Sequence, residues 1–161
     1  FMAIDGEHKG RILEDGICLQ MQDVTEIDSL DDALVLDTGS PHFVTIVDDL
    51  KNLDVKAEGE KIRNSTPFKK EGINVNFVLD NSNLQVRTYE RGIEDETLSC
   101  GTGVVATAIA MHYANCTKEN QININTKGGE LTVSFEEFNG VYRNIWLSGD
   151  VNMVYAGEFE C

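Results

Sequence analysis

A lone cysteine, Cys100, lies in the stretch LSCGTGVVATAIA, between a strand-like run and glycines that open an apolar helix. The first N–H groups of a helix lack internal partners and carry the positive end of its dipole. The turn Gly101-Thr102-Gly103 therefore predicts an anion site. A thiol at such a helix end can have its pKa lowered from about 8.5 to roughly 3.5–7.5, which supplies thiolate near neutral pH. The pattern predicts a base beside a binding site for a carboxylate.

The same residues also fit a purely structural interpretation. Cys100 would then be a small core residue, and Gly101 and Gly103 would serve a tight turn from strand to helix. Local pattern alone leaves the two interpretations open.

The remaining cysteines lack this context, and we expect all three to be structural: Cys18, Cys116 and Cys161. The sequence has no CxxC pair and no His/Cys cluster at zinc spacing, so it predicts neither a disulfide framework nor a metal site. Free thiols are typical of a reducing compartment, and we expect a cytoplasmic protein.

Length and charge narrow the class of protein. A chain of 161 residues with 41% apolar content suits one domain, spanning residues 1–161. Its formal charge of −15 would repel nucleic acid and anionic lipid, so we expect neither as a partner. No apolar run approaches the roughly 20 residues of a membrane span, and no basic-then-apolar leader opens the sequence.

Short runs rich in Val, Ile, Thr and aromatic residues predict strands, and the tight polar turns between them favour antiparallel neighbours. We expect the acidic run EIDSLDDA (26–33) to be a solvated loop. The predicted strands are residues 16–24, 33–39, 42–50, 73–80, 84–90, 122–124, 131–138, 141–149 and 151–157.

Two stretches have helical character. Residues 54–65 predict a polar, peripheral helix, whereas residues 101–115 are apolar almost all round and predict a buried one. Small residues in the second would let strands approach its backbone closely. The sequence therefore predicts an α+β fold in which a mostly antiparallel, barrel-like sheet curls around one central helix.

The stretch YERGIEDETLSCGTG, Tyr89 to Gly103, resembles the second active-site motif of the diaminopimelate epimerase family. The resemblance extends to DTGSPHFV (Asp37–Val44), to KIRNSTPF and GINVNFV within Lys61–Val78, and to the opening AIDGEH and the closing VYAGEFE. It covers nearly the whole chain in order. The segment between Arg91 and Cys100 is one residue longer than the commonest family form, and we expect the loop before Glu96 to absorb the extra residue.

The resemblance implies two pseudo-symmetric domains, each a barrel-like sheet around a central helix, of which this chain is the C-terminal one. The family inverts an amino-acid α-carbon without pyridoxal phosphate or another cofactor, with one cysteine from each domain. The implied reaction interconverts LL- and meso-diaminopimelate in lysine and peptidoglycan synthesis. The implied partners are the amino-acid substrate, an N-terminal half that carries the second cysteine, and a second copy in a homodimer.

Site residues follow from the motifs. The resemblance implies that Cys100 is one acid/base and that Glu90 contacts the reacting amino acid and influences the thiols. It also implies that Arg91 binds the distal end of the substrate and that His42 influences the protonation of the cysteine pair. A planar guanidinium suits a carboxylate because it makes a two-point contact. The residues implied to bind substrate are Ser40, Asn74, Glu90, Arg91, Gly101 and Thr102.

Alternatives remain for several of these residues. Glu90 and Arg91 could form an exposed ion pair at a strand end, and Asn74 could be a turn residue that satisfies the backbone. Ser40 stands where many family members have Asn, which leaves its substrate hydrogen bond open. For the whole chain, the alternatives are a catalytically silent carboxylate-binding module and a related amino-acid racemase.

Overall fold

The computed structural model describes residues 1–158 except 4–5, 15 and 82. Eleven strands form one sheet, a separate hairpin pairs β1 (Met2–Ala3) with β2 (Gly6–Glu7), and the helices are α1 (Val55–Arg63) and α2 (Gly101–Tyr113). The strands of the sheet are β3 (Gly10–Ile12), β4 (Ile17–Gln20), β5 (Ile27–Leu30), β6 (Ala33–Asp37), β7 (Pro41–Ile46), β8 (Asn74–Leu79), β9 (Gln85–Glu90), β10 (Asp95–Thr97), β11 (Gln121–Thr126), β12 (Gly129–Phe138) and β13 (Val141–Gly149).

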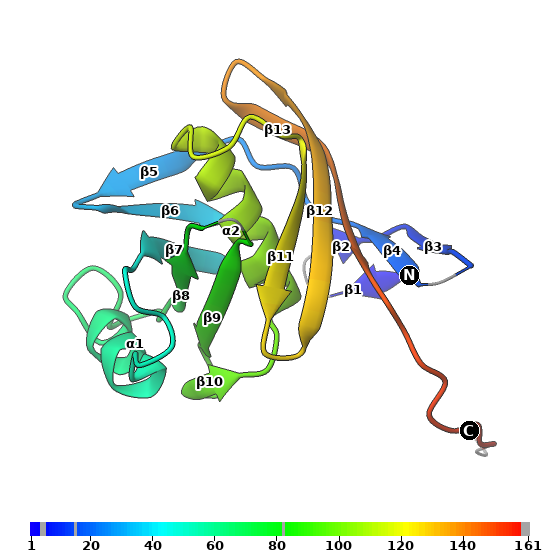
Figure 1. The fold of residues 1–161 in the computed structure, drawn as a ribbon, viewed down its shortest axis with the longest axis horizontal. Coiled ribbons are helices and arrows are strands. Elements are labelled where there is room, and N and C mark those ends of the chain that lie inside the picture. The colour runs from blue at the N-terminus through cyan, green and yellow to red at the C-terminus, as the bar shows by residue number, and fades with distance from the viewer. Residues whose placement is uncertain (4–5, 15, 82, 159–161) are drawn as a thin grey trace.

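The sheet curls around α2, as predicted, and the α+β fold class is confirmed (Figure 1). Its strand order is β3-β4-β13-β12-β11-β9-β8-β7-β6-β5, with β10 paired to β9, and it is not closed into a barrel. Among the described residues all pairs are antiparallel except β7–β8 and β9–β11. Parallel neighbours need a crossover connection, and α1 and α2 lie in these two connections.

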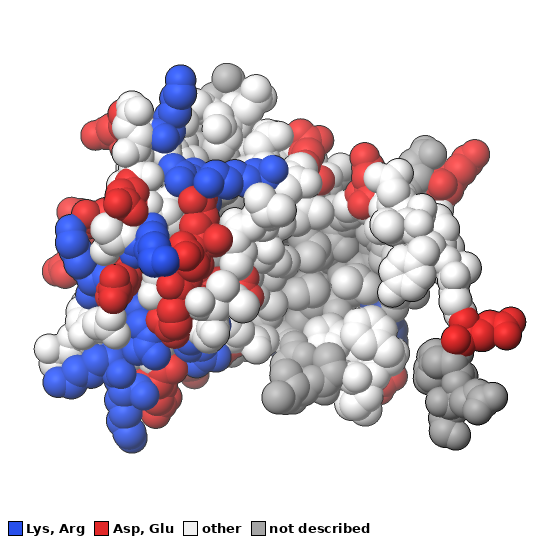
Figure 2. All heavy atoms as spheres, turned by 90° about the horizontal axis from the view of Figure 1, so that it is seen from below, with Lys and Arg blue, Asp and Glu red and all other residues white. Residues whose placement is uncertain are grey.

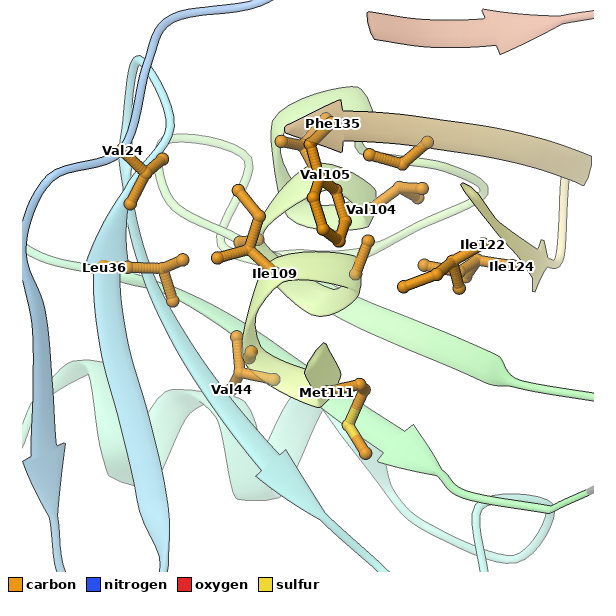
Figure 3. Packing of buried hydrophobic residues seen from close by; sticks show 14 of the residues in the cluster. Val24, Leu36, Val44, Val104, Val105, Ile109, Met111, Ile122, Ile124 and Phe135 are labelled. Atoms are coloured by element: carbon orange, nitrogen blue, oxygen red, sulfur yellow. The ribbon is translucent and has the colours of Figure 1, made fainter. Parts of the chain in front are cut away.

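Helix α2 forms the centre of the main core, which confirms the predicted buried helix. All its residues from Gly103 to Met111 are buried. Figure 3 shows its side chains between two walls of the sheet, with Leu36 and Val44 on one side and Ile124 and Phe135 on the other. A helix that is apolar all round is stable only when enclosed in this way.

Helix α1 packs on the outer face of the same sheet, where the sequence predicts a polar, peripheral helix. The Asp54 carboxylate caps it by accepting a hydrogen bond from the N–H of Ala57 at 3.0 Å. Its buried side meets a second apolar cluster that includes Val75 and Tyr89. Figure 2 shows charged side chains of both signs gathered over the end of the molecule that carries α1, where Lys56 pairs with Asp95.

Gly59 allows α1 to approach β9, because a Cβ at this position would clash with the Cβ and ring of Tyr89. Gly59→Ala should lower the free energy of unfolding by about 2 kcal/mol through overpacking, although alanine favours a helix by up to about 1 kcal/mol. Urea unfolding measures this, with the exposed Glu60→Ala in the same helix as the control. Unchanged or increased stability of Gly59→Ala would show that α1 does not pack this closely.

Two sequence-based expectations are wrong. Residues 26–33 were expected to be a loop, but Ile27–Leu30 forms β5, which pairs with β6 through a turn at Asp31. Residues 151–157 were expected to form a strand, but they have no regular secondary structure and are exposed. A strand needs a neighbour for its N–H and C=O groups, and no strand within the described residues pairs with this segment. None of the described helices is long and apolar enough to cross a bilayer.

Candidate active site

The N-terminus of α2 opens with Cys100 at its cap position, in an extended conformation and 8% exposed. The first backbone hydrogen bond of the helix runs from the N–H of Val104 to the carbonyl of Cys100 at 2.9 Å. The N–H groups of Gly101, Thr102 and Gly103 therefore have no intrahelical acceptor. Gly101 and Thr102 are partly exposed, so their N–H groups can serve a bound carboxylate, whereas Gly103 is buried.

The expected low pKa of Cys100 is wrong for this structure, because burial raises the pKa of the thiol. The Thr102 hydroxyl, 3.5 Å from Sγ, and the N–H groups of Gly103 and Thr102 lower it, and the Glu90 carboxylate raises it further. The sulfur lies near these N–H groups but makes no capping hydrogen bond with them. Removal from water thus opposes the thiolate more than the helix end favours it.

Alkylation should reveal this raised pKa. The rate of Cys100 modification by iodoacetamide should be low at neutral pH and climb beyond about pH 8.5, the pKa of a free cysteine, because only the thiolate reacts. Peptide mapping separates Cys100 from Cys116, which is exposed and should react first. A rate for Cys100 that levels off below neutral pH would contradict the effect of burial.

His42 is fully buried between two polar side chains. Its Nδ1 lies 3.0 Å from Nδ2 of Asn76, and its Nε2 lies 3.0 Å from Oγ1 of Thr102. Burial, together with the nearby charge of Arg91, lowers the pKa of His42 to about 3, so the ring is neutral at physiological pH. The predicted site residues His42, Thr102 and Cys100 therefore meet in one hydrogen-bonded group.

Asn74 joins three parts of the site. Its Nδ2 donates to Oγ of Ser40 at 2.5 Å and to the carbonyl of Pro41 at 3.0 Å, and its Oδ1 accepts from the N–H of Arg91 at 2.9 Å. Both amide hydrogens are thus used inside the protein. The alternative interpretation of Asn74, that it satisfies the backbone, describes these contacts, and substrate binding by Asn74 stays a prediction.

Glu90 and Arg91 do not form the ion pair considered for them. Within the described part of the chain neither side chain has an ion-pair partner, and the Arg91 guanidinium donates only to the carbonyl of Glu71, at 3.2 Å. Both are partly exposed. Their electrostatic effects on Cys100 and His42 place them beside the helix end, with unpaired charges that a substrate can meet.

The loop between Arg91 and Cys100 is more ordered than a solvated insertion. Gly92 and Glu94 have positive φ, 92° and 57°, and form the turn between β9 and β10. The Glu94 carboxylate accepts hydrogen bonds from the Tyr89 hydroxyl at 2.9 Å and from Arg63 at 3.0 Å. The turn precedes Glu96, and that it absorbs an extra residue stays a prediction.

The sequence interpretation missed Asn76, which is fully buried on β8. It lies two residues after Asn74, on the same face, and its Oδ1 would be only 2.5 Å from a Cβ placed on Gly103. The lack of a side chain at Gly103 therefore makes room for Asn76. A second amide in the apolar run INVNFV was the available signal, because an unpaired buried amide is costly.

Neither the neighbouring cleft nor a metal site adds a binding function to these residues. A cleft of about 580 Å³ begins at Gly39 and Pro41, on either side of Ser40, but its lining includes Asp23, Glu26 and Asp37. These carboxylates would repel an anionic ligand. Among the described residues no three His, Cys, Asp or Glu side chains are placed to hold a metal ion, and Cys161 lies outside these residues.

Comparison with known proteins decides the family. The model of the diaminopimelate epimerase family matches residues 34–154. The chain belongs to the diaminopimelate epimerase family. It is 51% identical to the diaminopimelate epimerase of Flavobacterium psychrophilum over 96% of this chain and 62% of that protein. It is 40% identical to that of Aquifex aeolicus over 76% of this chain and 44% of that protein, so it spans about half the length of such relatives.

Two solved structures share the fold of this chain. A probable proline racemase from Agrobacterium radiobacter K84 aligns with 91% of this chain and 55% of its own, at a TM-score of 0.63 and 16% identity. A hydroxyproline epimerase from Agrobacterium vitis aligns with 91% and 54%, at a TM-score of 0.61 and 15% identity. At these identities the likeness supports the architecture alone.

Proposed function

We propose that this chain is the C-terminal half of a diaminopimelate epimerase that interconverts the LL and meso isomers without pyridoxal phosphate. The observation that carries the proposal is a thiol beside a helix end with free N–H groups, in a chain of this family. Gly101 and Thr102 would bind the carboxylate next to the reacting carbon. Arg91, which has no ion pair within the described residues, would bind the distal end of the substrate.

The proposed reaction moves one proton on each face of the α-carbon. A thiolate on one face removes the α-proton, and the electron pair is delocalised into the carboxylate held by the helix N–H groups. A thiol on the other face then delivers its own proton to carbon and becomes the thiolate. The raised pKa of Cys100 suits the thiol partner, which must hold its proton until delivery.

We propose that the second acid/base comes from outside this chain, since no other cysteine within the described residues lies at a glycine-flanked helix start. The relatives are longer, and we propose that a preceding half carries this group. Exposed apolar side chains such as Ile12, Met153 and Tyr155 give that half a surface to cover. A homodimer and a cytoplasmic location stay predictions.

The test compares this chain with the complete polypeptide, meaning the chain together with the proposed preceding half. Proton NMR follows meso formation from LL-diaminopimelate without added cofactor. The complete polypeptide should form the meso isomer, and this chain alone should show a folded circular dichroism spectrum but no activity. No meso formation by the complete polypeptide would refute the proposal, and meso formation by this chain alone would refute the need for a second half.

The buried, protonated thiol favours one alternative, a module that binds carboxylates without catalysis. Such a module would bind diaminopimelate in the complete polypeptide but would not exchange its α-protons with solvent. Isothermal titration calorimetry combined with the NMR assay separates the two functions.

Arg91→Lys in the complete polypeptide should reduce kcat/KM by about 2 kcal/mol, roughly thirtyfold, because lysine cannot make a planar two-point contact. Lys51→Arg, an exposed substitution away from the helix end, is the control. Steady-state kinetics at equal folded concentration give the comparison. Wild-type kinetics for Arg91→Lys would show that Arg91 is a surface residue without a substrate contact.

A further inference from the structure

Buried polar side chains form a continuous row of hydrogen bonds that reaches Cys100. Oγ1 of Thr88 donates to Oδ1 of Asn76 at 2.9 Å, and Nδ2 of Asn76 lies 3.0 Å from Nδ1 of His42. Nε2 of His42 lies 3.0 Å from Oγ1 of Thr102, which lies 3.5 Å from Sγ of Cys100. Thr88 is 3% exposed, and Asn76 and His42 are fully buried.

The orientation of the Asn76 amide is fixed by two further contacts. Its Nδ2 also donates to the carbonyl of Phe43 at 3.1 Å, an atom that can only accept. Its Oδ1 accepts the hydrogen bond from Thr88. Nδ2 therefore faces His42, and since it has only hydrogens to offer, Nδ1 of the ring must be the acceptor.

This contact determines which atom donates in each of the other hydrogen bonds of the row. A neutral imidazole has one N–H, so with Nδ1 accepting, Nε2 carries the hydrogen and donates it to the Thr102 oxygen. The hydroxyl hydrogen of Thr102 is then left for the sulfur of Cys100. All donors in the row point from Asn76 toward Cys100.

We infer that Asn76 is a positioning residue: it holds His42 in the Nε2–H tautomer, and thereby directs the Thr102 hydroxyl hydrogen at the sulfur of Cys100. A hydrogen bond from this hydroxyl stabilises the thiolate that remains after Cys100 delivers its proton. The inference rests on the proposed function only for the catalytic use of that thiolate. Gly103 is part of the arrangement, because a Cβ there would displace the Asn76 amide.

The first test needs no substitution. In the 15N-labelled chain, long-range 1H–15N spectra distinguish a ring nitrogen with hydrogen from one without. Burial should keep the His42 ring neutral well below the usual histidine pKa of about 6.5, so its ring nitrogens can be observed in the neutral form. The expected spectrum shows Nε2 protonated and Nδ1 unprotonated. An Nδ1–H tautomer would overturn the inference, whatever the outcome of any variant.

The second test removes the donor with Asn76→Leu. Nδ1 of His42 then loses the donor from which it accepts, so the contact that keeps the ring hydrogen on Nε2 is gone. In the Nδ1–H tautomer, Nε2 would compete with sulfur for the Thr102 hydroxyl. We expect the Nδ1–H tautomer to appear, and the pKa of Cys100, read from the pH dependence of alkylation, to rise by about one unit, a tenfold loss of thiolate.

Two further variants separate this role from a structural one. Thr102→Val removes the hydroxyl itself, so Asn76→Leu should not shift the pKa of Cys100 further in that background. Thr107→Val removes another buried hydroxyl of α2, which bonds the carbonyl of Gly103, and should leave the His42 tautomer unchanged. A shift that persists in the Thr102→Val background, or an unchanged tautomer in Asn76→Leu, would overturn the role of Asn76. None of these measurements depends on epimerase activity, so they are independent of the proposed function.

Discussion

Gly103→Ala should lower the free energy of unfolding by about 2–4 kcal/mol, although alanine is the better helix former by up to about 1 kcal/mol. The new Cβ would lie 2.5 Å from Oδ1 of Asn76 and 3.4 Å from Sγ of Cys100. The amide cannot simply move, because it is hydrogen-bonded to Thr88, His42 and the Phe43 carbonyl. Displacing it leaves buried polar atoms unpaired.

Gly101→Ala is a matched control from the same helix turn. Its Cβ would meet only Cδ2 of Leu147, at 3.0 Å, and a flexible side-chain end can shift. Its stability should stay within about 1 kcal/mol of the parent. Urea unfolding of both variants makes the comparison, and equal stability of the two would contradict the close packing of α2 on Asn76.

Cys100→Ala in the complete polypeptide should reduce kcat/KM for LL-diaminopimelate by a factor of about 10²–10⁴, the usual contribution of a positioned acid or base. One face of the α-carbon would then lack a proton donor, while the N–H groups of Gly101 and Thr102 could still bind the carboxylate. KM should therefore change much less than kcat.

Cys116→Ala is the control for this loss, because Cys116 is exposed just beyond the C-terminal end of α2. Its kinetics should match the parent. Retained activity of Cys100→Ala, with both proteins folded by circular dichroism, would mean that Cys100 is a structural residue.

The sequence predicted the central helix and the curled sheet because their signals are local. Residues 103–111 lack polar residues other than Thr107, and such a segment must be enclosed. The parallel pairs β7–β8 and β9–β11 were not predicted, because pairing direction depends on where α1 and α2 cross the sheet. The segment 151–157 has a strand-like composition, but composition does not supply a neighbouring strand.

The sequence predicted most residues of the candidate site, but it did not predict the pKa of Cys100. The glycines after Cys100 indicated a helix end correctly, yet the pKa depends on how deeply the thiol is buried. Burial is set by residues distant in sequence that only the fold brings to the start of α2, where Leu147 lies beside Gly101. Asn76 was missed for a similar reason, because its partners come from β7 and β9, which only the folded sheet brings together.

The most direct test of the proposed chemistry is the deuterium content of the first meso-diaminopimelate formed by the complete polypeptide in D₂O. With a thiol on one face and a thiolate on the other, the inverted α-carbon should carry solvent deuterium from the earliest turnovers. Unreacted LL substrate should still carry its original α-proton. A meso product that retains the original proton would contradict two separate acid/base groups, and with it the assignment of Cys100 as one of them.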